Sequence, residues 1–307
     1  MSQTGGALQS EGARRAIYAG VLLALALPFF IPWHLASFVS PETESLFETI
    51  ERLAAERDSR IVLLMSDWGP GTKGENEPQF LALARHLLAR RLPVAVLTVM
   101  SDPVGMYYAH NRLVALVAEA NARLAEGERP LRYGEDWINL GMKTKGERVG
   151  DSVIPILQAF CHDIHAFTVQ DINGETLGRF PIMQRLRTIA DVSLVIEVSA
   201  GELETLDWLS AIQPRHPGLG VALATMSIVA TKMLPYFKSG QLAGFLDGSR
   251  GADEYNELLH RAILPRERLF DPEKDRRKNA LSTGRMFVVA MIVLGNCLYF
   301  ARRRRPG

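Results

Sequence analysis

Cysteine and net charge are both scarce in this sequence. Its 307 residues include two cysteines, Cys161 and Cys297, which are too few for a disulfide framework. The 35 lysines and arginines nearly balance the 34 aspartates and glutamates, so the formal net charge is +1. Nucleic-acid binders need a strong basic field to attract phosphates, and this balance argues against that class of partner. The chain also lacks internal repeats and low-complexity tracts, and its 47% hydrophobic content is that of a globular protein.

Two apolar segments are present, one near each end of the chain. Residues 16–35 carry no formal charge, and twenty such residues would span about 30 Å as a helix, enough to cross a bilayer. Residues 286–301 form a shorter apolar segment between Arg285 and four arginines at 302–305. We predict a transmembrane helix in each segment. A cleaved signal peptide is the alternative for the first segment, and a core helix is the alternative for the second.

The charges around these segments predict an orientation in the cell membrane. Arginines at 14–15 precede the first segment and three glutamates follow it between positions 42 and 48, which favours a cytoplasmic N-terminus. Two spans would place both termini in the cytoplasm and the intervening domain outside it. Four basic residues between 274 and 278 favour the opposite orientation, which stays open. The partners implied are the lipid bilayer, with a membrane protein or a second copy of the chain.

The central part of the chain alternates between short apolar runs and amphipathic segments. The runs predict buried strands at residues 61–65, 93–99, 137–140, 192–198 and 220–224, and the segments between them show helical spacing. Ser40-Pro41-Glu42 predicts a helix start, with Ser40 as its N-cap. Fully apolar strands that alternate with helices indicate a parallel sheet covered on both faces. The predicted fold class is α/β, with a mostly parallel, doubly wound, Rossmann-like sheet between two transmembrane helices.

These features predict six consecutive parts of the chain. They are an N-terminal tail (1–15), a transmembrane helix (16–35), an α/β domain (40–263), a charged linker (264–285), a second transmembrane helix (286–301) and a basic tail (302–307).

Polar residues follow several of the predicted strands. Asp67 follows the first strand, Ser101 and Asp102 follow the second, and Glu197 and Ser199 end the strand at 192–198. Ligands of open parallel sheets bind beyond the carboxyl ends of the strands, so two carboxylates, Asp67 and Glu197, would converge on one crevice. The candidate catalytic residues are Asp67, Glu197 and Ser101.

The segment Gly69-Pro70-Gly71-Thr72-Lys73-Gly74 matches G-x-G-x-x-G after a strand. The pattern is typical of dinucleotide-binding loops, but the sequence Glu75-Asn76-Glu77-Pro78 predicts a delayed helix start, which does not suit that motif. There are two alternatives. One is a plain glycine turn, and the other is a loop that binds an anionic or polar ligand through Lys73 and backbone N–H groups. The candidate ligand-binding residues are Asp67, Gly69, Gly71, Lys73, Gly74, Asp102 and Ser199.

The segment Cys161-His162-Asp163-Ile164-His165 contains four potential metal ligands. No second cluster with zinc-finger spacing accompanies it, and nothing beside Cys161 indicates an activated thiol, so we predict a surface or core loop and assign no metal ligand.

Several motifs resemble those of a family of membrane-anchored prokaryotic proteins of unknown function. They are DWGPGTKGENEPQ, YGEDWINLG, PIMQ, PYFKSGQLAGFLDG and GADEY, and the resemblance covers roughly residues 60–260. It implies a shared domain, and no activity, cofactor or catalytic residue.

The sequence leads to two functional hypotheses. The first is a membrane-tethered α/β module for ligand sensing or scaffolding, because anchors at both ends would fix its position for partners in the same membrane. The alternative is a membrane-bound hydrolase, with or without a divalent metal, in which Asp67 and Glu197 act on a phosphate or ester. The sequence identifies no cofactor and leaves open whether the protein is an enzyme.

Overall fold

A computed structural model describes residues 11–30, 38–99, 103–124, 126–143, 153–262, 283–284, 286–293 and 295–296. The chain divides into two compact units. Residues 37–263 form the central unit, and residues 1–36 with 264–307 form the terminal unit.

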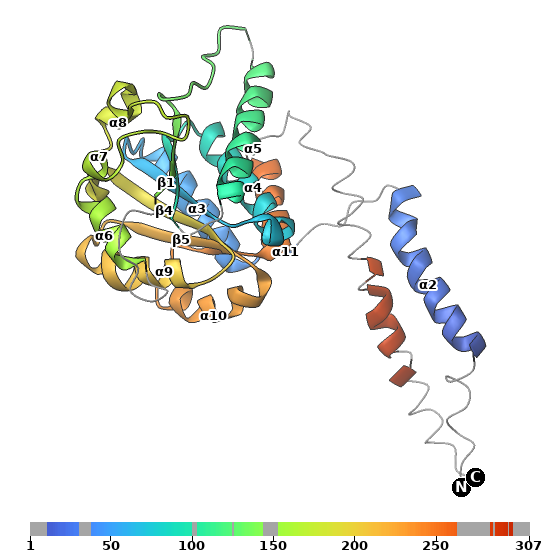
Figure 1. Cartoon of the computed structure of the whole chain (residues 1–307). Coiled ribbons are helices and arrows are strands. Elements are labelled where there is room, and N and C mark those ends of the chain that lie inside the picture. Colours follow the sequence, from blue (N-terminus) through green and yellow to red (C-terminus); the bar gives the residue numbers. More distant parts are fainter. Residues whose placement is uncertain are drawn as a thin grey trace, which may run out of the picture. The chain divides into compact units, whose positions relative to one another are not determined.

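The described residues of the central unit contain one sheet of six parallel strands (Figure 1). The chain runs outward from the first strand to the third, returns to the centre, and then runs outward in the other direction. This arrangement confirms the predicted α/β class with a parallel, doubly wound, Rossmann-like sheet. The last strand was not predicted. The spatial order is β3 (Trp137–Met142), β2 (Val94–Thr98), β1 (Ile61–Asp67), β4 (Val192–Ser199), β5 (Gly220–Thr225) and β6 (Phe245–Asp247).

Helices cover both faces of this sheet (Figure 1). One face carries α3 (Pro41–Ala55), α4 (Lys73–Ala89), α5 (Pro103–Ala122) and α11 (Gly248–Ala262). The opposite face carries α6 (Ile154–His162), α9 (Leu203–Asp207), a π-helix (Trp208–Ile212) and α10 (Ser227–Lys238), with the short helices α7 (Ile164–Phe167) and α8 (Pro181–Gln184) nearby.

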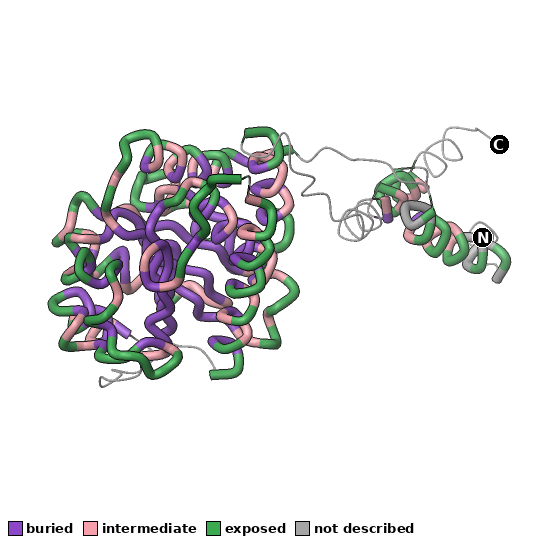
Figure 2. Tube along the Cα trace, turned by 90° about the horizontal axis from the view of Figure 1, so that it is seen from above, coloured by how far each residue is buried: buried purple, intermediate pink, exposed green. Residues whose placement is uncertain are grey.

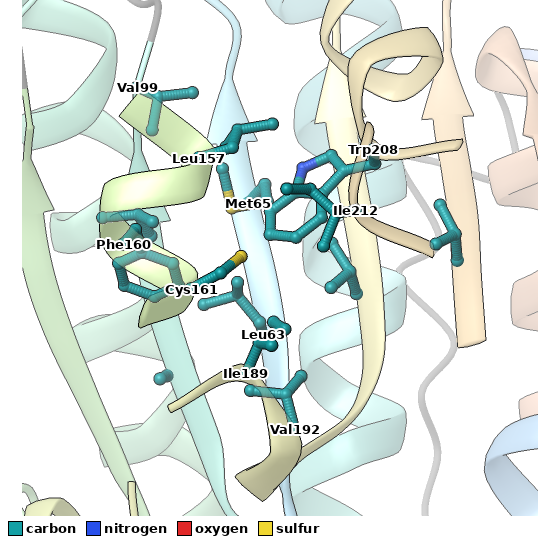
Figure 3. Packing of buried hydrophobic residues seen from close by; sticks show 14 of the residues in the cluster. Leu63, Met65, Val99, Leu157, Phe160, Cys161, Ile189, Val192, Trp208 and Ile212 are labelled. Atoms are coloured by element: carbon teal, nitrogen blue, oxygen red, sulfur yellow. The ribbon is translucent and has the colours of Figure 1, made fainter. Parts of the chain in front are cut away.

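The apolar core explains why the strands are buried on both sides. Alternate side chains of β1, including Leu63 and Met65, lie in a cluster with Leu157 and Phe160 of α6 and with Trp208 (Figure 3). Figure 2 shows the buried positions gathered in the middle of the central unit. Burial of these large apolar side chains is the main force that holds the helices of this face onto the sheet.

The predicted helix at Ser40 is confirmed, although its cap differs from the prediction. The Ser40 hydroxyl makes no capping bond within its own helix. Instead, the Ser40 backbone N–H and hydroxyl both donate to Glu254 Oε2 of α11, at 2.9 and 2.6 Å. The start of α3 is therefore fixed by a tertiary contact between two helices of the same layer.

A buried polar network joins these two helices to α4. His86 of α4 is fully buried, and its Nε2 lies 2.6 Å from Glu51 Oε1 of α3. Its Nδ1 lies 2.6 Å from the Tyr255 hydroxyl of α11, and its ring stacks on Phe47. Burial lowers the pKa of His86 to about 4, so the ring is neutral at pH 7. For Glu51, burial alone would raise the pKa, but hydrogen bonds from Arg90 and His86 outweigh it and lower the pKa.

This network predicts a loss of stability in mild acid. Between pH 6.5 and about 4 the unfolded chain protonates His86 and the folded chain does not, so the free energy of unfolding falls as the pH falls. The contribution amounts to at most about 3 kcal/mol. A His86→Gln variant should show a shallower pH dependence over this range in urea unfolding. Equal pH dependence in the two proteins would contradict the burial of a neutral ring.

The terminal unit contains α2 (Glu11–Phe30) and a helical segment at residues 286–293. The two segments pack closely, because a Cβ atom at Gly20 would lie 2.5 Å from the Phe287 ring. No helix among the described residues is both long enough and apolar enough to cross a membrane. The predictions of transmembrane helices at 16–35 and 286–301 and of a two-pass membrane localisation are therefore wrong. Residues 31–35, 294 and 297–301 of those segments lie outside the described residues.

Candidate functional site

The strand order reverses between β1 and β4, which makes the carboxyl ends of these strands the topological switch point of the sheet. Open α/β sheets bind ligands in the crevice beyond this point. The register brings four polar residues into one row across the edge, because Asp67 pairs with Ser199, Ser199 with Thr225, and Thr225 with Asp247. The structure brings three of the predicted site residues, Asp67, Glu197 and Ser199, close together at this edge.

Glu197 lies two residues before Ser199 on β4 and is fully buried. Burial, followed by the neighbouring charges of Asp67 and Glu204, raises the pKa of Glu197 well above its ordinary value. Glu197 therefore keeps its proton to a higher pH than an exposed glutamate does. The cluster is a buried acid next to carboxylates, and it lies beneath the edge of the sheet rather than on its surface.

The side chains of Asp67 and Ser199 both make hydrogen bonds that hold nearby backbone in place. Asp67 is 6% exposed, and its Oδ1 accepts a 2.8 Å hydrogen bond from the Val99 N–H, which ties β1 to the end of β2. The Ser199 hydroxyl lies 3.2 Å from Glu204 Oε2 and accepts a bond from the Gly201 N–H. These contacts fold the residues after β4 back over the strand end.

The predicted hydrolase is therefore wrong. A base or nucleophile needs access to substrate, and both carboxyl groups, Asp67 and Glu197, are enclosed. Within the described ranges, no group of three or more histidine, cysteine, aspartate or glutamate side chains could hold a metal ion. Ser101 and Asp102, the other candidates from the sequence, lie outside the described residues.

The glycine-rich loop after β1 is open to its surroundings. Pro70–Thr72 form a turn of 3-10 helix, and α4 begins directly afterwards at Lys73, with Pro78 inside the helix. The predicted delay of this helix is wrong. A Cβ atom at Gly69, Gly71 or Gly74 would meet no atom within 4 Å. Gly74 therefore does not provide the close helix–sheet contact of a dinucleotide fingerprint, and the loop presents free space instead.

Lys73 provides a positive charge at the start of α4. Its Nζ lies 4.3 Å from the centre of the Tyr108 ring and 3.9 Å from Glu77 Oε2. Contact with Tyr108, followed by the charge of Glu77, raises the pKa of Lys73, so the amine is fully charged at neutral pH. Glu77 also pairs with Arg112 at 2.6 Å, which leaves the Lys73 charge only partly compensated.

The first turn of α5 packs directly against this loop. A Cβ atom at Gly105 would lie 2.2 Å from the Trp68 carbonyl oxygen and 3.1 Å from Gly69 Cα, so only glycine allows this approach. The N-termini of two long helices, α4 and α5, are thereby brought to one loop. Helix N-termini carry partial positive charge and N–H groups that attract anions.

Two buried amides of α4 hold the other strand ends, and the sequence did not reveal them. Asn76 Nδ2 donates to the Ser199 carbonyl at 3.0 Å. Gln79 Nε2 lies 2.9 Å from the Thr225 carbonyl and 2.8 Å from that of Gly248. The only sequence signal was their spacing of three on the apolar side of the helix. They fix the ends of β4, β5 and the start of α11 to α4, and so set the shape of the edge.

The cysteine–histidine segment is structural. Cys161 is buried near the end of α6, and burial raises the pKa of its thiol to about 12, which rules out a reactive thiolate. His165 Nε2 lies 2.9 Å from the carbonyl oxygens of Met183 and Leu186.

Comparisons with known proteins find a distant structural likeness. No protein-family model and no curated protein matches the chain. A UDP-forming α,α-trehalose-phosphate synthase from Burkholderia xenovorans matches with 14% identity and a TM-score of 0.34, over 82% of this chain and 50% of that one. The N-terminal domain of trehalose-6-phosphate phosphatase from Candida albicans matches with 8% identity and a TM-score of 0.32, over 91% and 48%.

The chain thus spans about half the length of the solved structures that it matches. Likeness at these identities and TM-scores carries no conclusion about activity. The predicted resemblance to a membrane-anchored family is wrong, because no family model or curated protein matches and no described helix could cross a membrane. The predicted function as a membrane-tethered sensing or scaffolding module is wrong for the same reason.

Proposed function

We propose that the central unit binds a small phosphate-bearing molecule at the carboxyl edge of the sheet, with the phosphate over the loop between β1 and α4. The observation that carries this proposal is the open glycine loop, Gly69 to Gly74, at the N-termini of α4 and α5 and beside Lys73. A ligand at a topological switch point is the common arrangement in open α/β sheets.

The chemistry of the loop favours a phosphate group. Successive backbone N–H groups at a helix start can surround several anionic oxygens, and glycines allow those oxygens to approach the backbone. The Lys73 ammonium group is charged and lies at the surface. A phosphate could therefore contact it without removing the ammonium group from solvent. Tyr107, which is 53% exposed on the first turns of α5, offers an aromatic surface near the same edge.

The buried acids beneath the edge would then have a structural role. Asp67 fixes the end of β2. Glu197 is fully buried below it, and its raised pKa favours the uncharged form, which does not repel an anionic ligand. The proposal concerns binding, and it assigns no chemical step to these residues.

Calorimetric titration of the full chain tests this proposal. The probes are inorganic phosphate and adenosine monophosphate, with adenosine as the uncharged control, at constant ionic strength. A Lys73→Gln variant should weaken binding of both phosphates about fivefold to tenfold, because one charge-assisted contact is lost.

Lys238→Gln is the matched control, because Lys238 is an exposed lysine at the end of α10. It should leave both affinities unchanged. The proposal is contradicted if adenosine binds as well as its phosphate, if neither phosphate binds, or if the two lysine variants lose affinity equally.

A further inference from the structure

A pocket of about 520 Å³ opens at the opposite edge of the sheet, beside the amino ends of β2 and β3. Sites for small molecules have volumes of about 300–1,000 Å³. The pocket is distinct from the carboxyl edge, since Pro93 directly precedes β2 and Asp136 directly precedes β3. Its lining residues come from three loops and from α8: Arg91, Pro93, Arg129, Glu135, Asp136, Pro181, Gln184 and Arg185.

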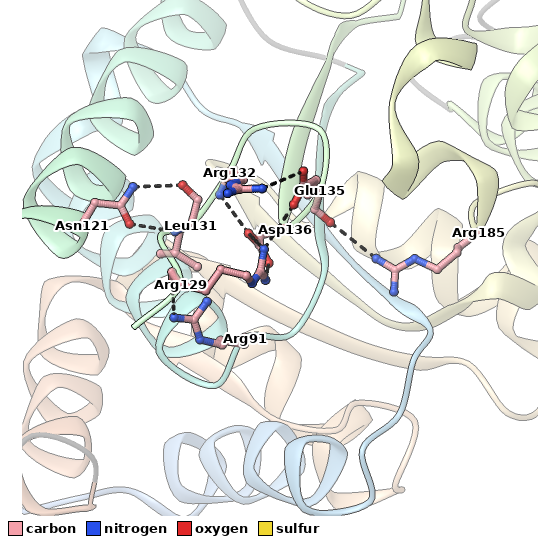
Figure 4. A network of polar contacts seen from close by, with 8 residues as sticks. All are labelled: Arg91, Asn121, Arg129, Leu131, Arg132, Glu135, Asp136 and Arg185. Carbon is pink, nitrogen blue, oxygen red and sulfur yellow. Dashed lines mark hydrogen bonds and ion pairs between the residues drawn. The ribbon is translucent and has the colours of Figure 1, made fainter. Parts of the chain in front are cut away.

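The two carboxylates of the pocket are already paired. Arg129 donates to both oxygens of Asp136 and reaches Glu135 Oε2 at 3.2 Å (Figure 4). The Arg132 backbone N–H donates to Asp136 Oδ2 at 2.8 Å, and its guanidinium lies 3.4 Å from Glu135 Oε1. The negative charge of this turn is therefore compensated by two arginines from its own loop.

The other two arginines of the lining, Arg91 and Arg185, take no part in these ion pairs. Arg91 Nη2 donates to the Arg129 carbonyl at 2.5 Å, and Arg185 Nη2 lies 3.5 Å from the Glu135 carbonyl. In the part of the chain that the structure describes, neither guanidinium lies within 4 Å of a carboxylate. Both side chains are on exposed residues, and Figure 4 shows them approaching the Glu135 turn from different sides.

The walls of the pocket are held in place by backbone contacts. The Ile182 N–H donates to the Gly134 carbonyl at 2.9 Å, which fixes α8 to the turn before β3. Gly134 has a φ of +78°, and a Cβ there would lie 2.3 Å from the Phe180 ring, so the approach requires glycine. Asn121 of α5 makes two hydrogen bonds with the backbone of Leu131, which holds the loop that carries Arg129. The arginines therefore extend from fixed supports, which lowers the entropic cost of binding.

We infer that this pocket binds a small molecule with at least two anionic groups, one at Arg91 and one at Arg185. A guanidinium presents a planar fork of donors that matches a carboxylate or a phosphate, and it keeps its charge at every physiological pH. Two separated forks require two anionic groups on one ligand. Gln184, which also lines the pocket, can hydrogen-bond to a polar group of that ligand. This inference does not depend on the site proposed at the carboxyl edge.

Calorimetric titration at constant ionic strength tests the inference in two arms. The carboxylate arm compares citrate with acetate, and the phosphate arm compares fructose 1,6-bisphosphate with inorganic phosphate. We expect the multiply charged member of at least one pair to bind about tenfold or more tightly than its singly substituted control. The arm that shows this difference identifies the anionic group.

Variants then locate the binding. Arg91→Gln and Arg185→Gln should each weaken the preferred probe about tenfold, because each removes one fork from an exposed position without altering the core. Arg215→Gln, at an exposed arginine outside the pocket, should leave its affinity unchanged. The inference is overturned if neither polyanion binds better than its control, or if Arg215→Gln causes the same loss as the pocket variants. Circular dichroism confirms that each variant is folded.

Discussion

A Glu197→Gln variant is expected to be more stable than the parent protein at pH 8 and equally stable near pH 4.5. Burial and the charges of Asp67 and Glu204 raise the pKa of Glu197 in the folded state. Above the ordinary pKa of 4.5 the unfolded chain therefore releases a proton that the folded chain retains. The parent loses about 1.4 kcal/mol of stability per pH unit from this group until the folded-state pKa is reached. Glutamine has the shape of the protonated acid and does not titrate.

Urea unfolding of both proteins from pH 4.5 to 8 measures this difference. A Glu119→Gln variant, at a side chain that is 54% exposed, is the matched control and should follow the parent. If Glu197→Gln were less stable than the parent at pH 8, or if the difference did not depend on pH, then Glu197 would not be a buried, protonated acid. His86 titrates with the opposite sign at lower pH, so the comparison between variant and parent isolates Glu197.

A Gly105→Ala variant is expected to lose about 1–3 kcal/mol of stability, the usual range for overpacking of a well-packed contact. Its Cβ would lie 2.2 Å from a backbone oxygen, that of Trp68, which cannot rotate away as a side chain would. The N-terminus of α5 would have to move off the loop after β1. Chemical denaturation of the full chain measures the loss.

Gly74→Ala is the matched control for this change. Both glycines lie in the first turns of helices, but a Cβ at Gly74 meets nothing within 4 Å. Alanine favours a helix over glycine, so Gly74→Ala should be neutral or should stabilise the protein by up to about 1 kcal/mol. If the two variants had equal stability, α5 would not pack on the loop as described.

The strands could be predicted from sequence because a strand that is buried on both faces appears as a short run of apolar residues. Each of the predicted runs corresponds to a strand, since a parallel sheet between two helical layers requires apolar residues at most positions. β6 was missed because Phe245–Asp247 is only three residues long and includes a charged residue. The helices between residues 154 and 184 were also missed, because their short lengths give little periodicity.

The polar groups were harder to predict because sequence does not show their burial. The rule for open sheets predicted Asp67 and Glu197 near the carboxyl edge, and the structure places both residues there. Their enclosure follows from tertiary contacts, such as the bond from Val99 and the return of Glu204 to Ser199. The hydrolase hypothesis failed for this reason.

The arginine pocket has no sequence motif at all. Arg91 and Arg129 are 38 positions apart, and Glu135 and Arg185 are 50 apart. They meet because β2 and β3 are neighbours in the sheet and because α8 is fixed to Gly134. Such a site becomes visible only when the strand order is known.

The most direct test of the proposed ligand site is a titration of the isotope-labelled chain with inorganic phosphate, followed by backbone amide chemical shifts in NMR. The largest shifts are predicted at Gly71, Lys73 and Gly74 and at the first turn of α5, and Lys73→Gln should reduce them. The absence of shifts at the glycine loop, or shifts confined to other parts of the chain, would contradict a phosphate site at the carboxyl edge of the sheet.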